Sequence, residues 1–196
     1  MAETDDAVAD TGSANSGAGT DATGDSPGTL YVVGIGPGLP HAMTQRAKDV
    51  VATADCVIAS NLYQEFLRRD GTLPPESAEV EAAAAGDAAP DGGTSAGSES
   101  GTVLERPSGT RQTLVRSSMG RQVELAREAF ERVRAGEDVA HVSGGDPNVY
   151  GKSDLLFTMA EAEGADDVPI EVVPGVTAAL GGAANLGAPL SNDFCT

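Results

Sequence analysis

The sequence predicts an α/β domain of three layers, with helices on both faces of a mainly parallel sheet. Short apolar runs typical of buried strands alternate with longer segments that have helical spacing, and this alternation is typical of parallel sheets. Glycine-rich turns follow three of the runs, at residues 34–38, 144–151 and 174–175. Because the carboxyl ends of parallel strands meet at one edge of the sheet, these turns predict a binding cleft there. Short turns between a strand and a helix also favour glycine and proline for their backbone geometry alone.

Two pairs of strand and helix are expected first along the chain. Residues 29–34 form an apolar run that ends in glycine, which is typical of a buried strand. Residues 43–54 have helical spacing. The apolar side of this helix consists of Ala47, Val50, Val51 and Ala54. A second strand is expected at residues 56–59 and a second helix at residues 61–69.

The same alternation continues in the second half of the chain. The expected elements are a strand at 111–115, a helix at 121–134, a strand at 139–142, a helix at 154–163, a strand at 170–173 and a helix from Thr177. The helix at 121–134 is amphipathic, because its charged residues lie away from its apolar face. That face is expected to consist of Val123, Ala126, Phe130 and Val133. Gly136 suits the end of this helix, since glycine readily adopts the backbone conformation that ends helices.

Two acidic stretches are expected not to fold. Residues 1–28 contain six acids and residues 76–105 contain seven, and neither stretch contains Lys or Arg. Both are nearly free of large apolar side chains, so they cannot bury enough apolar surface to offset the entropy of ordering the backbone. The predicted organisation is a disordered tail at 1–28 and one domain at 29–196, with a disordered insertion at about 76–105.

The charge of the chain excludes one class of partner. The formal net charge is −18, of which the two acidic stretches carry −6 and −7, so that −5 remains for the rest. Nucleic acid is not an expected partner, because binding it needs a basic stripe. The acid excess, with Lys48 and Lys152 as the only lysines, is typical of halophilic proteins, in which dense carboxylates maintain solubility at high salt. An ordinary protein with acidic linkers would have the same balance.

The chain is expected to be cytoplasmic and to hold no metal. No apolar stretch approaches the ~18 residues of a membrane span. The acidic N-terminus lacks the basic and then apolar segments of a signal peptide. Cys56 and Cys195 match no metal-ligand spacing, and Cys56 is expected to be a buried small hydrophobe. His141 is expected to be a core histidine with satisfied hydrogen bonds, whereas His41 could cap a helix, lie in solvent or contact a ligand.

The first glycine loop, Gly34-Ile-Gly-Pro-Gly38, does not fit a dinucleotide site. That fingerprint is G-x-G-x-x-G, whose third glycine lets the helix pack closely on the strand. Here the sixth position is Leu39, and Ser60 and Asn61 stand where an acid is expected after the second strand. The phosphate-binding pattern G-x-x-x-x-G-K-[ST] is absent as well. The sequence therefore disfavours a nicotinamide-dependent oxidoreductase.

The second loop, Ser143-Gly-Gly-Asp-Pro-Asn-Val-Tyr-Gly151, suits a ligand with no phosphate to neutralise. Gly144 and Gly145 have no Cβ, so their backbone can approach a ligand closely. Asp146 offers an acceptor to amino or hydroxyl groups, and Pro147 fixes the direction of the backbone after it. The alternative is that Asp146 only caps the turn that follows.

Four motifs in order resemble the tetrapyrrole (corrin/porphyrin) methylases. They are Val33-Gly-Ile-Gly-Pro-Gly38 with Met43-Thr44, Ala54-Asp-Cys-Val-Ile58, the loop from Ser143 to Gly151, and Glu171-Val-Val-Pro-Gly-Val-Thr-Ala178. The resemblance covers residues 29–196, interrupted by the acidic insertion. Within the family, two shorter motifs look most like the precorrin-3B C17-methyltransferases. These are Met119-Gly-Arg-Gln122, and Leu186-Gly-Ala-Pro-Leu190 with Asp193-Phe194.

The resemblance implies methyl transfer from S-adenosyl-L-methionine to C17 of precorrin-3B or its cobalt form, with ring contraction, in cobalamin biosynthesis. Carried over by position, the cofactor contacts would be Pro37, Gly144, Gly145, Asp146, Val149, Thr177 and Ala178. These residues fall on the three glycine-rich turns. The resemblance further implies a corrinoid small-molecule substrate, a homodimer at full length, and a second α/β domain that this chain lacks. The chain would then be a fragment, which could be inactive, or the product of a shortened gene.

Some assignments stay open. Asn192 stands where relatives often have a histidine, which puts the role of that histidine in doubt. The residues name no general base, so the catalytic residues are unassigned. Arg111, Arg116 and Arg121 could bind the carboxylates of a corrinoid, or could be solvated. The alternatives to C17 methylation are another corrin or porphyrin C-methyltransferase of the family and a non-catalytic domain that binds the cofactor.

Overall fold

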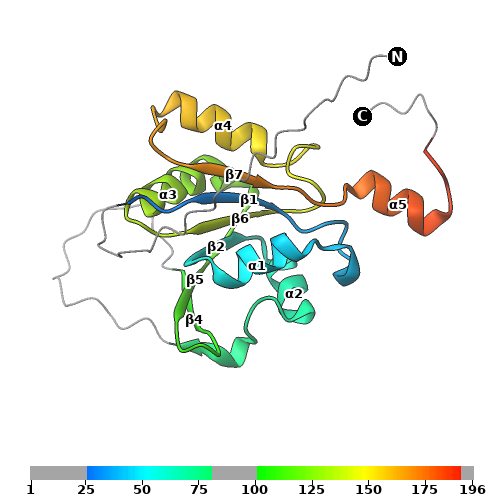
Figure 1. Ribbon diagram of the computed structural model, residues 1–196, viewed down its shortest axis with the longest axis horizontal. Coiled ribbons are helices and arrows are strands. Elements are labelled where there is room, and N and C mark those ends of the chain that lie inside the picture. The colour runs from blue at the N-terminus through cyan, green and yellow to red at the C-terminus, as the bar shows by residue number, and fades with distance from the viewer. Residues whose placement is uncertain (1–25, 81–100, 191–196) are drawn as a thin grey trace, which may run out of the picture.

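One mixed sheet organises the molecule. The computed structural model describes residues 26–80 and 101–190. In these residues the sheet has the strand order β3-β4-β5-β2-β6-β1-β7 (Figure 1). The strands are β1 (Leu30–Gly34), β2 (Cys56–Ala59), β3 (Glu79–Val80), β4 (Thr102–Glu105), β5 (Arg111–Arg116), β6 (Val139–Ser143) and β7 (Ile170–Val173). The strands from β5 to β7 in this order are parallel, whereas β3 and β4 form an antiparallel edge.

Helices cover both faces of the sheet. The structure contains α1 (Gln45–Thr53), α2 (Asn61–Asp70), α3 (Gln122–Arg134), α4 (Ser153–Ala162) and α5 (Ala178–Leu186), with short 3-10 turns η1 (Pro40–Ala42), η2 (Glu76–Ala78) and η3 (Met119–Arg121). Helices α1 and α2 pack on one face, and α3 and α4 pack on the other. The predicted three-layer α/β class with a mainly parallel sheet is confirmed. Within the described parts of the chain, every helix is too short or too polar to cross a membrane.

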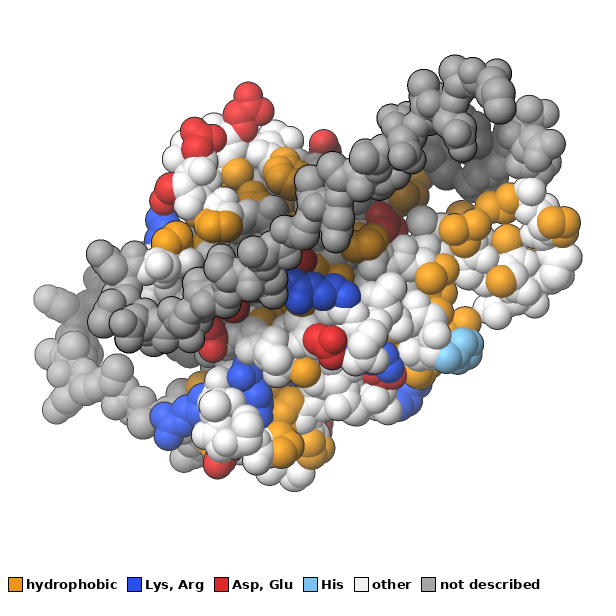
Figure 2. All heavy atoms as spheres, in the orientation of Figure 1, with side chains coloured by type: hydrophobic (Ala, Val, Ile, Leu, Met, Phe, Trp, Pro, Cys, Tyr) orange, Lys and Arg blue, Asp and Glu red, His pale blue; other side chains and the backbone are white. Residues whose placement is uncertain are grey.

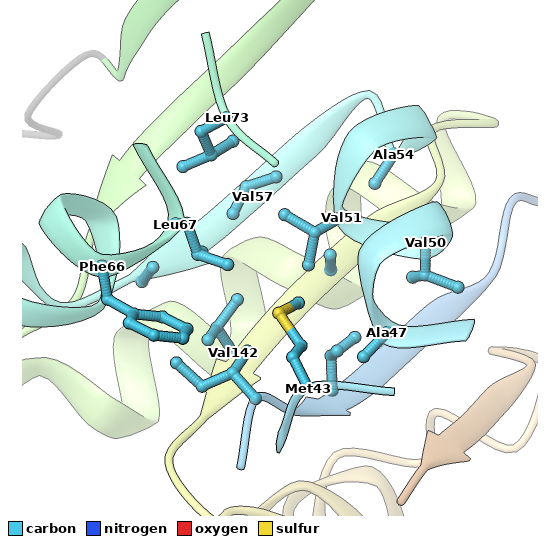
Figure 3. Close-up of a cluster of buried hydrophobic side chains, with 14 of the residues drawn as sticks. Met43, Ala47, Val50, Val51, Ala54, Val57, Phe66, Leu67, Leu73 and Val142 are labelled. Atoms are coloured by element: carbon cyan, nitrogen blue, oxygen red, sulfur yellow. The ribbon is translucent and has the colours of Figure 1, made fainter. Parts of the chain in front are cut away.

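The central strands are buried on both faces, which explains why they are continuous apolar runs. Every residue of β2 and β6 is buried. Alternate side chains enter two separate apolar clusters, as the twofold period of a strand requires. Figure 3 shows the first cluster, in which α1 and α2 direct Val51 and Leu67 onto the sheet near Val57 and Val142. Each fully buried aliphatic side chain of this kind contributes about 1.5–3 kcal/mol.

Side-chain caps set the starts of three helices. Thr44 Oγ1 accepts a hydrogen bond from the Ala47 N–H (3.2 Å) at the start of α1. Ser60 Oγ accepts from the Tyr63 N–H (3.4 Å) at the start of α2. Thr177 Oγ1 accepts from the Leu180 N–H (3.2 Å) at the start of α5. A cap of this type contributes about 1 kcal/mol, because it satisfies a backbone donor that the helix itself leaves unpaired.

Helix α5 extends beyond the carboxyl edge of the sheet (Figure 1). Its residues are mostly Ala, Gly and Leu, and among them only Gly181 is buried. Apolar side chains therefore gather on its surface, and Leu180 and Leu186 are exposed (Figure 2).

The predicted buried face of the third long helix needs a correction. The buried residues of α3 are Leu125, Ala126, Ala129, Phe130 and Val133. Val123, which was expected on this face, is 41% exposed. The two alanines occupy the centre of the face and let α3 lie close to the sheet, but their small side chains give a weak apolar signal in sequence.

The sheet also extends into both ends of the stretch predicted not to fold. Strands β3 and β4 pair with each other, and β4 pairs with β5. Leu104 anchors β4, because its side chain is fully buried in the cluster beneath α1 and α2. The prediction of disorder over 76–105 is therefore wrong at these flanks. The rest of that stretch, residues 81–100, lies outside the described residues, as do residues 1–25 of the predicted tail.

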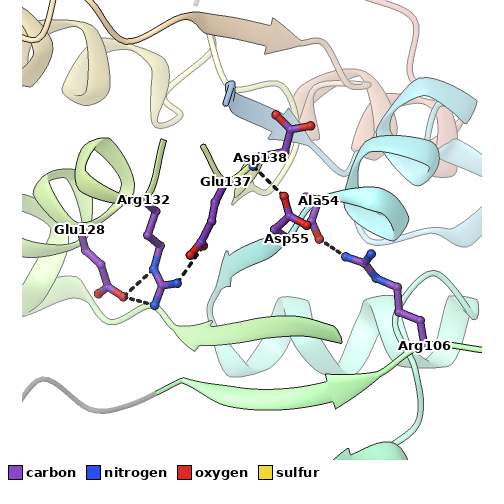
Figure 4. Close-up of polar contacts among 7 residues, drawn as sticks. All are labelled: Ala54, Asp55, Arg106, Glu128, Arg132, Glu137 and Asp138. Atoms are coloured by element: carbon purple, nitrogen blue, oxygen red, sulfur yellow. Dashed lines mark hydrogen bonds and ion pairs between the residues drawn. The ribbon is translucent and has the colours of Figure 1, made fainter. Parts of the chain in front are cut away.

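Polar contacts fix the amino edge of the sheet (Figure 4). Asp55 Oδ2 accepts a hydrogen bond from the Asp138 N–H (3.0 Å), which joins the starts of β2 and β6. Arg132 lies between two carboxylates, 3.1 Å from Glu128 Oε1 and 3.0 Å from Glu137 Oε2. The charged groups of this edge thus hold strands and helix ends together, whereas the glycine-rich turns lie at the opposite, carboxyl edge.

Candidate functional site

The three glycine-rich turns meet at the carboxyl edge, as expected. Gly36 and Gly145 exchange two backbone hydrogen bonds, of 3.1 Å and 2.8 Å, in an isolated antiparallel bridge. The third turn joins them through the Gly175 N–H, which donates to Asp146 Oδ2 (3.0 Å). The Gly36–Gly145 bridge joins segments about 110 residues apart, and the Gly175–Asp146 bond joins segments about 30 residues apart, so the three turns form one continuous rim.

Glycine is required where these turns cross. A Cβ on Gly34 would lie 2.7 Å from the carbonyl oxygen of Gly145. A Cβ on Gly175 would lie 2.9 Å from the carbonyl oxygen of Gly34 and closer still to that of Gly145. Any side chain at these two positions would push the turns apart, because the neighbouring atoms are backbone and cannot rotate away.

A cavity of about 540 Å³ opens beside this rim. It falls in the size range of small-molecule sites, which are mainly apolar with a few polar groups. Its lining includes five of the seven predicted cofactor contacts: Pro37, Gly144, Gly145, Val149 and Ala178. The other two, Asp146 and Thr177, are not among the lining residues.

Asp146 and Thr177 do not line the cavity, but their side chains hydrogen-bond to the backbone of the turns that form the rim and of α5. Asp146 Oδ1 accepts from the Asn148 N–H (2.9 Å), and its Oδ2 accepts from the Gly175 N–H. Asp146 thus caps its own turn, as the alternative interpretation had it, and also fastens that turn to the one before α5. Thr177 caps α5. Both residues fix the position of the cavity wall, and whether Asp146 also accepts a hydrogen bond from a ligand stays a prediction.

Helix α2 forms the opposite wall of the cavity, which the sequence interpretation missed. The lining residues on α2 are Leu62, Tyr63, Glu65, Phe66 and Arg69. Leu62 is 70% exposed, an unusual environment for a leucine on an otherwise amphipathic helix. A Cβ on Gly144 would lie 2.6 Å from the Tyr63 hydroxyl, so the tyrosine and the glycine loop are in direct contact. Ser60 acts as the cap of α2.

Tyr150 has a strained backbone at the mouth of the cavity. It is the one non-glycine residue with a positive φ (51°) in the described ranges, and its side chain is 92% exposed. A left-handed conformation costs a residue with a Cβ about 1–2 kcal/mol. The ring also makes little compensating contact with the rest of the chain, so the structure gives no packing reason for an aromatic residue here. Strain of this kind gathers at functional sites.

We expect Tyr150→Gly to raise the free energy of unfolding by about 1 kcal/mol, because glycine adopts this φ without strain. Urea unfolding measures the change. Asn148→Gly is the control, since Asn148 has no positive φ and glycine there should be neutral or destabilising. A less stable Tyr150→Gly variant would mean that the exposed ring makes contacts worth more than the strain.

His141 and Lys152 are polar residues on the face of the sheet that α3 and α4 cover, near the loop of residues 143–151. His141 is fully buried, and neither of its ring nitrogens has a hydrogen-bond partner in the described structure. Burial, and secondarily the charge of Lys152, lowers the pKa of His141 to about 3. The prediction of a core histidine is confirmed, whereas no hydrogen bond to the described residues supports the prediction that its ring nitrogens are satisfied. Lys152 donates to Gln122 Oε1 and to Ser117 Oγ (3.4 Å), and burial lowers the pKa of this lysine.

The other titratable candidates do not converge on the cavity. Arg111 and Arg116 lie at opposite ends of β5, and Arg121 bonds to Glu124 (3.0 Å), so none of the three arginines lines the cavity or gathers with the others at one place. His41 lies exposed in η1. Cys56 is fully buried, as expected, and burial raises its pKa to about 12. Cys195 and Asn192 lie outside the described residues. Within 26–80 and 101–190, no group of three His, Cys, Asp or Glu could hold a metal ion.

Comparison with known proteins finds one protein family and several of its members. The family described as Tetrapyrrole (Corrin/Porphyrin) Methylases matches residues 29–196. The precorrin-3B C(17)-methyltransferase of Sinorhizobium sp is 33% identical over 86% of this chain and 52% of its own. The chain spans about half the length, or less, of the curated relatives that it matches first.

Two solved structures of methyltransferases have folds similar to that of this chain. The methyltransferase CobJ superposes with a TM-score of 0.60 and 27% identity, over 86% of this chain and 54% of CobJ. A uroporphyrin-III C-methyltransferase from Thermus thermophilus, complexed with S-adenosyl homocysteine, superposes with a TM-score of 0.52 and 25% identity, over 84% of this chain and 54% of the other.

Proposed function

The chain belongs to the tetrapyrrole (corrin/porphyrin) methylases, and from this premise we propose that it forms the S-adenosyl-L-methionine-binding part of a methyltransferase of cobalamin biosynthesis. The observation that carries the proposal is the meeting of three glycine-rich turns around one cavity. A related enzyme binds S-adenosyl homocysteine. We further propose that residues 29–196 are one domain of this enzyme, which acts in the cytoplasm as a homodimer.

The residues present fit this cofactor. Gly144 and Gly145 leave room that a Cβ would fill, so the backbone can approach a ligand. The glycine turns carry no cation, which suits a ligand without phosphate. Val149 and Ala178 offer apolar contact at the rim. Pro37 restricts the first turn.

The reaction that we propose in detail is methylation of C17 of precorrin-3B, or of its cobalt form, with ring contraction. The names of relatives about 30% identical support this substrate. A second candidate is another tetrapyrrole C-methylation, because the structural similarity extends to the uroporphyrin-III enzyme. A non-catalytic cofactor-binding domain is the third.

The main catalytic contribution that we propose for the residues lining the cavity is to align the methyl donor with the methyl acceptor. When bound, the cofactor supplies a sulfonium-activated methyl group, so the protein needs no nucleophile of its own. The rim and the wall on α2 would hold donor and acceptor in line and exclude water, effects that together contribute up to about 7–11 kcal/mol. Tyr63 and Glu65 are the titratable groups of the lining other than Tyr150 and Arg69. We assign none of them as general base.

Isothermal titration with S-adenosyl-L-homocysteine tests the cofactor proposal. We expect binding by the wild-type chain and weaker binding by Asp146→Ala. The substitution leaves the Gly175 N–H without its acceptor and frees the turn before α5, which should cost about 1–3 kcal/mol, or about 5- to 150-fold in affinity. Asp166→Ala is the matched control, because Asp166 is an exposed carboxylate remote from the lining. No binding by the wild-type chain would refute the proposal, and equal affinities would leave Asp146 with no role in cofactor binding.

A further inference from the structure

The cavity extends beyond the proposed cofactor contacts, along α2. Leu62, Phe66 and Arg69 follow one another at helical spacing and line it together. None of the seven proposed cofactor contacts lies on α2. This part of the cavity, which we call the α2 arm, therefore has a wall that the cofactor proposal does not use. The wall is apolar at Leu62 and Phe66 and ends in a guanidinium.

The guanidinium of Arg69 has no carboxylate partner among the described residues. The chain has 30 acids and only 12 Lys and Arg. Most cations of the described residues bind a carboxylate, and the adjacent Arg68 does so at 2.7 Å from Glu79. Arg69 forms no ion pair or hydrogen bond with the described residues. Glu65 lines the same arm four residues earlier, yet it forms no ion pair with Arg69.

An exposed arginine on a cavity wall, with no partner among the described residues, can bind an anionic ligand. With a net charge of −18, this protein repels anionic ligands at long range. A local cation that no carboxylate of residues 26–80 and 101–190 neutralises offsets this repulsion where the ligand binds. Guanidinium suits a carboxylate, because its planar fork donates two parallel hydrogen bonds. The neighbouring apolar wall suits a flat hydrophobic body attached to that carboxylate.

We propose that the α2 arm holds the methyl acceptor, with its ring system against Leu62 and Phe66 and one of its carboxylates on Arg69. Arg69 is then a specificity-determining residue, which selects acceptors that carry an acidic side chain at that distance from the ring. Glu65 acts in the opposite sense and weakens acceptors that place a second carboxylate beside it. This inference rests on the proposed function, since it assigns the acceptor end of the same cavity.

Titration with uroporphyrin, a fluorescent tetrapyrrole that carries eight carboxylates, tests the inference on residues 1–196 with S-adenosyl-L-homocysteine present. We expect Arg69→Gln to raise the Kd for uroporphyrin about tenfold and Glu65→Gln to lower it about two- to threefold. Arg111→Gln is the matched control. Arg111 is likewise exposed and forms no ion pair with the part of the chain that the structure describes. The substitution removes the same charge, but Arg111 lies at the amino end of β5, outside the lining. Its Kd should stay within twofold of wild type.

The outcomes separate this inference from the proposed function. Equal weakening by Arg69→Gln and Arg111→Gln would reduce the effect to net charge and overturn the assignment. An unchanged Kd in Arg69→Gln, or no binding of uroporphyrin, would overturn it too, while intact affinity for S-adenosyl-L-homocysteine would leave the proposed function standing. If the wild-type chain does not bind S-adenosyl-L-homocysteine, the proposed function is refuted, and so is the inference that rests on it.

Discussion

Replacing His141 with leucine should stabilise this protein at neutral pH by about 1–3 kcal/mol. The imidazole is fully buried in β6, and both of its nitrogens lack partners in the described structure. A buried polar group without a hydrogen bond carries its full desolvation penalty, and an apolar side chain of similar size does not. Leucine would join the apolar cluster beneath α3 and α4, to which its neighbours Val139 and Ile58 contribute.

The advantage of leucine should grow as the solution is acidified. The pKa of His141 is about 3 in the folded protein, against about 6.5 in the unfolded chain. Between these values the unfolded state binds a proton that the folded state refuses, so stability is lost as the pH falls from about 6.5 towards 3. Each unit of pH in this window costs about 1.4 kcal/mol, and at pH 4 the histidine should therefore cost roughly 3 kcal/mol more than at neutral pH.

Urea unfolding of both proteins at pH 7, 5 and 4 measures this difference directly. Other titrating groups cancel in the comparison, because the two chains differ only at residue 141. The control is His41→Gln, which removes the other histidine of the chain, an exposed residue of η1. The same pH dependence in wild type and His141→Leu would mean that His141 keeps an ordinary pKa, which requires hydrogen-bond partners such as buried water.

Gly175→Ala should disrupt both the stability of the rim and its affinity for ligand. The new methyl group would lie 2.9 Å from the Gly34 carbonyl oxygen and closer to that of Gly145, so the turn before α5 would have to move. Overpacking of this kind costs about 1–3 kcal/mol. Movement of the turn would also lengthen the hydrogen bond to Asp146 and displace Ala178 from the cavity wall. We expect affinity for S-adenosyl-L-homocysteine to fall at least tenfold.

Gly182→Ala is the control for Gly175→Ala, because it adds the same methyl group at an uncrowded position. Gly182 is exposed in α5, and no atom lies within 4 Å of a Cβ built there. Alanine in the interior of a helix is about 0.5–1 kcal/mol more favourable than glycine, so this variant should be more stable. Two identical substitutions seven residues apart should thus have opposite effects in urea unfolding. Equal stabilities for the two variants would contradict the crowding described at the rim.

Helices and turns were predicted most accurately where the apolar pattern of the sequence and its capping or turn residues indicate the same element. Helix α1 has a clear apolar side and a threonine cap, and its boundaries were within two residues. The rim was predicted because each turn follows a buried strand, and parallel strands bring their carboxyl ends together. Five of the seven proposed contacts consequently lie on the cavity.

The features that were missed depend on contacts from distant segments. Strand β4 carries one fully buried residue, Leu104, in an otherwise acidic context, and it is a strand only because β5 lies beside it. The apolar residues of α2 gave no means of telling core from cavity, so Leu62 and Arg69 escaped notice. The isolation of His141 could not be foreseen, because hydrogen-bond partners for a strand residue come from helices far along the chain.

The strand order has a consequence for synthesis on the ribosome. In the described residues strand β1 pairs with β6 and β7, and its partners in β6 lie 109 residues further on, as Leu30 and Val139 do. At about 5–20 residues per second, β1 waits several seconds or longer for its first neighbour. Throughout that time the backbone edges of β1 lack these strand partners and can associate with other nascent chains. The two stretches without a basic residue, 1–28 and 76–105, precede and follow it in this interval. Their like charges would keep neighbouring nascent chains apart until β6 emerges.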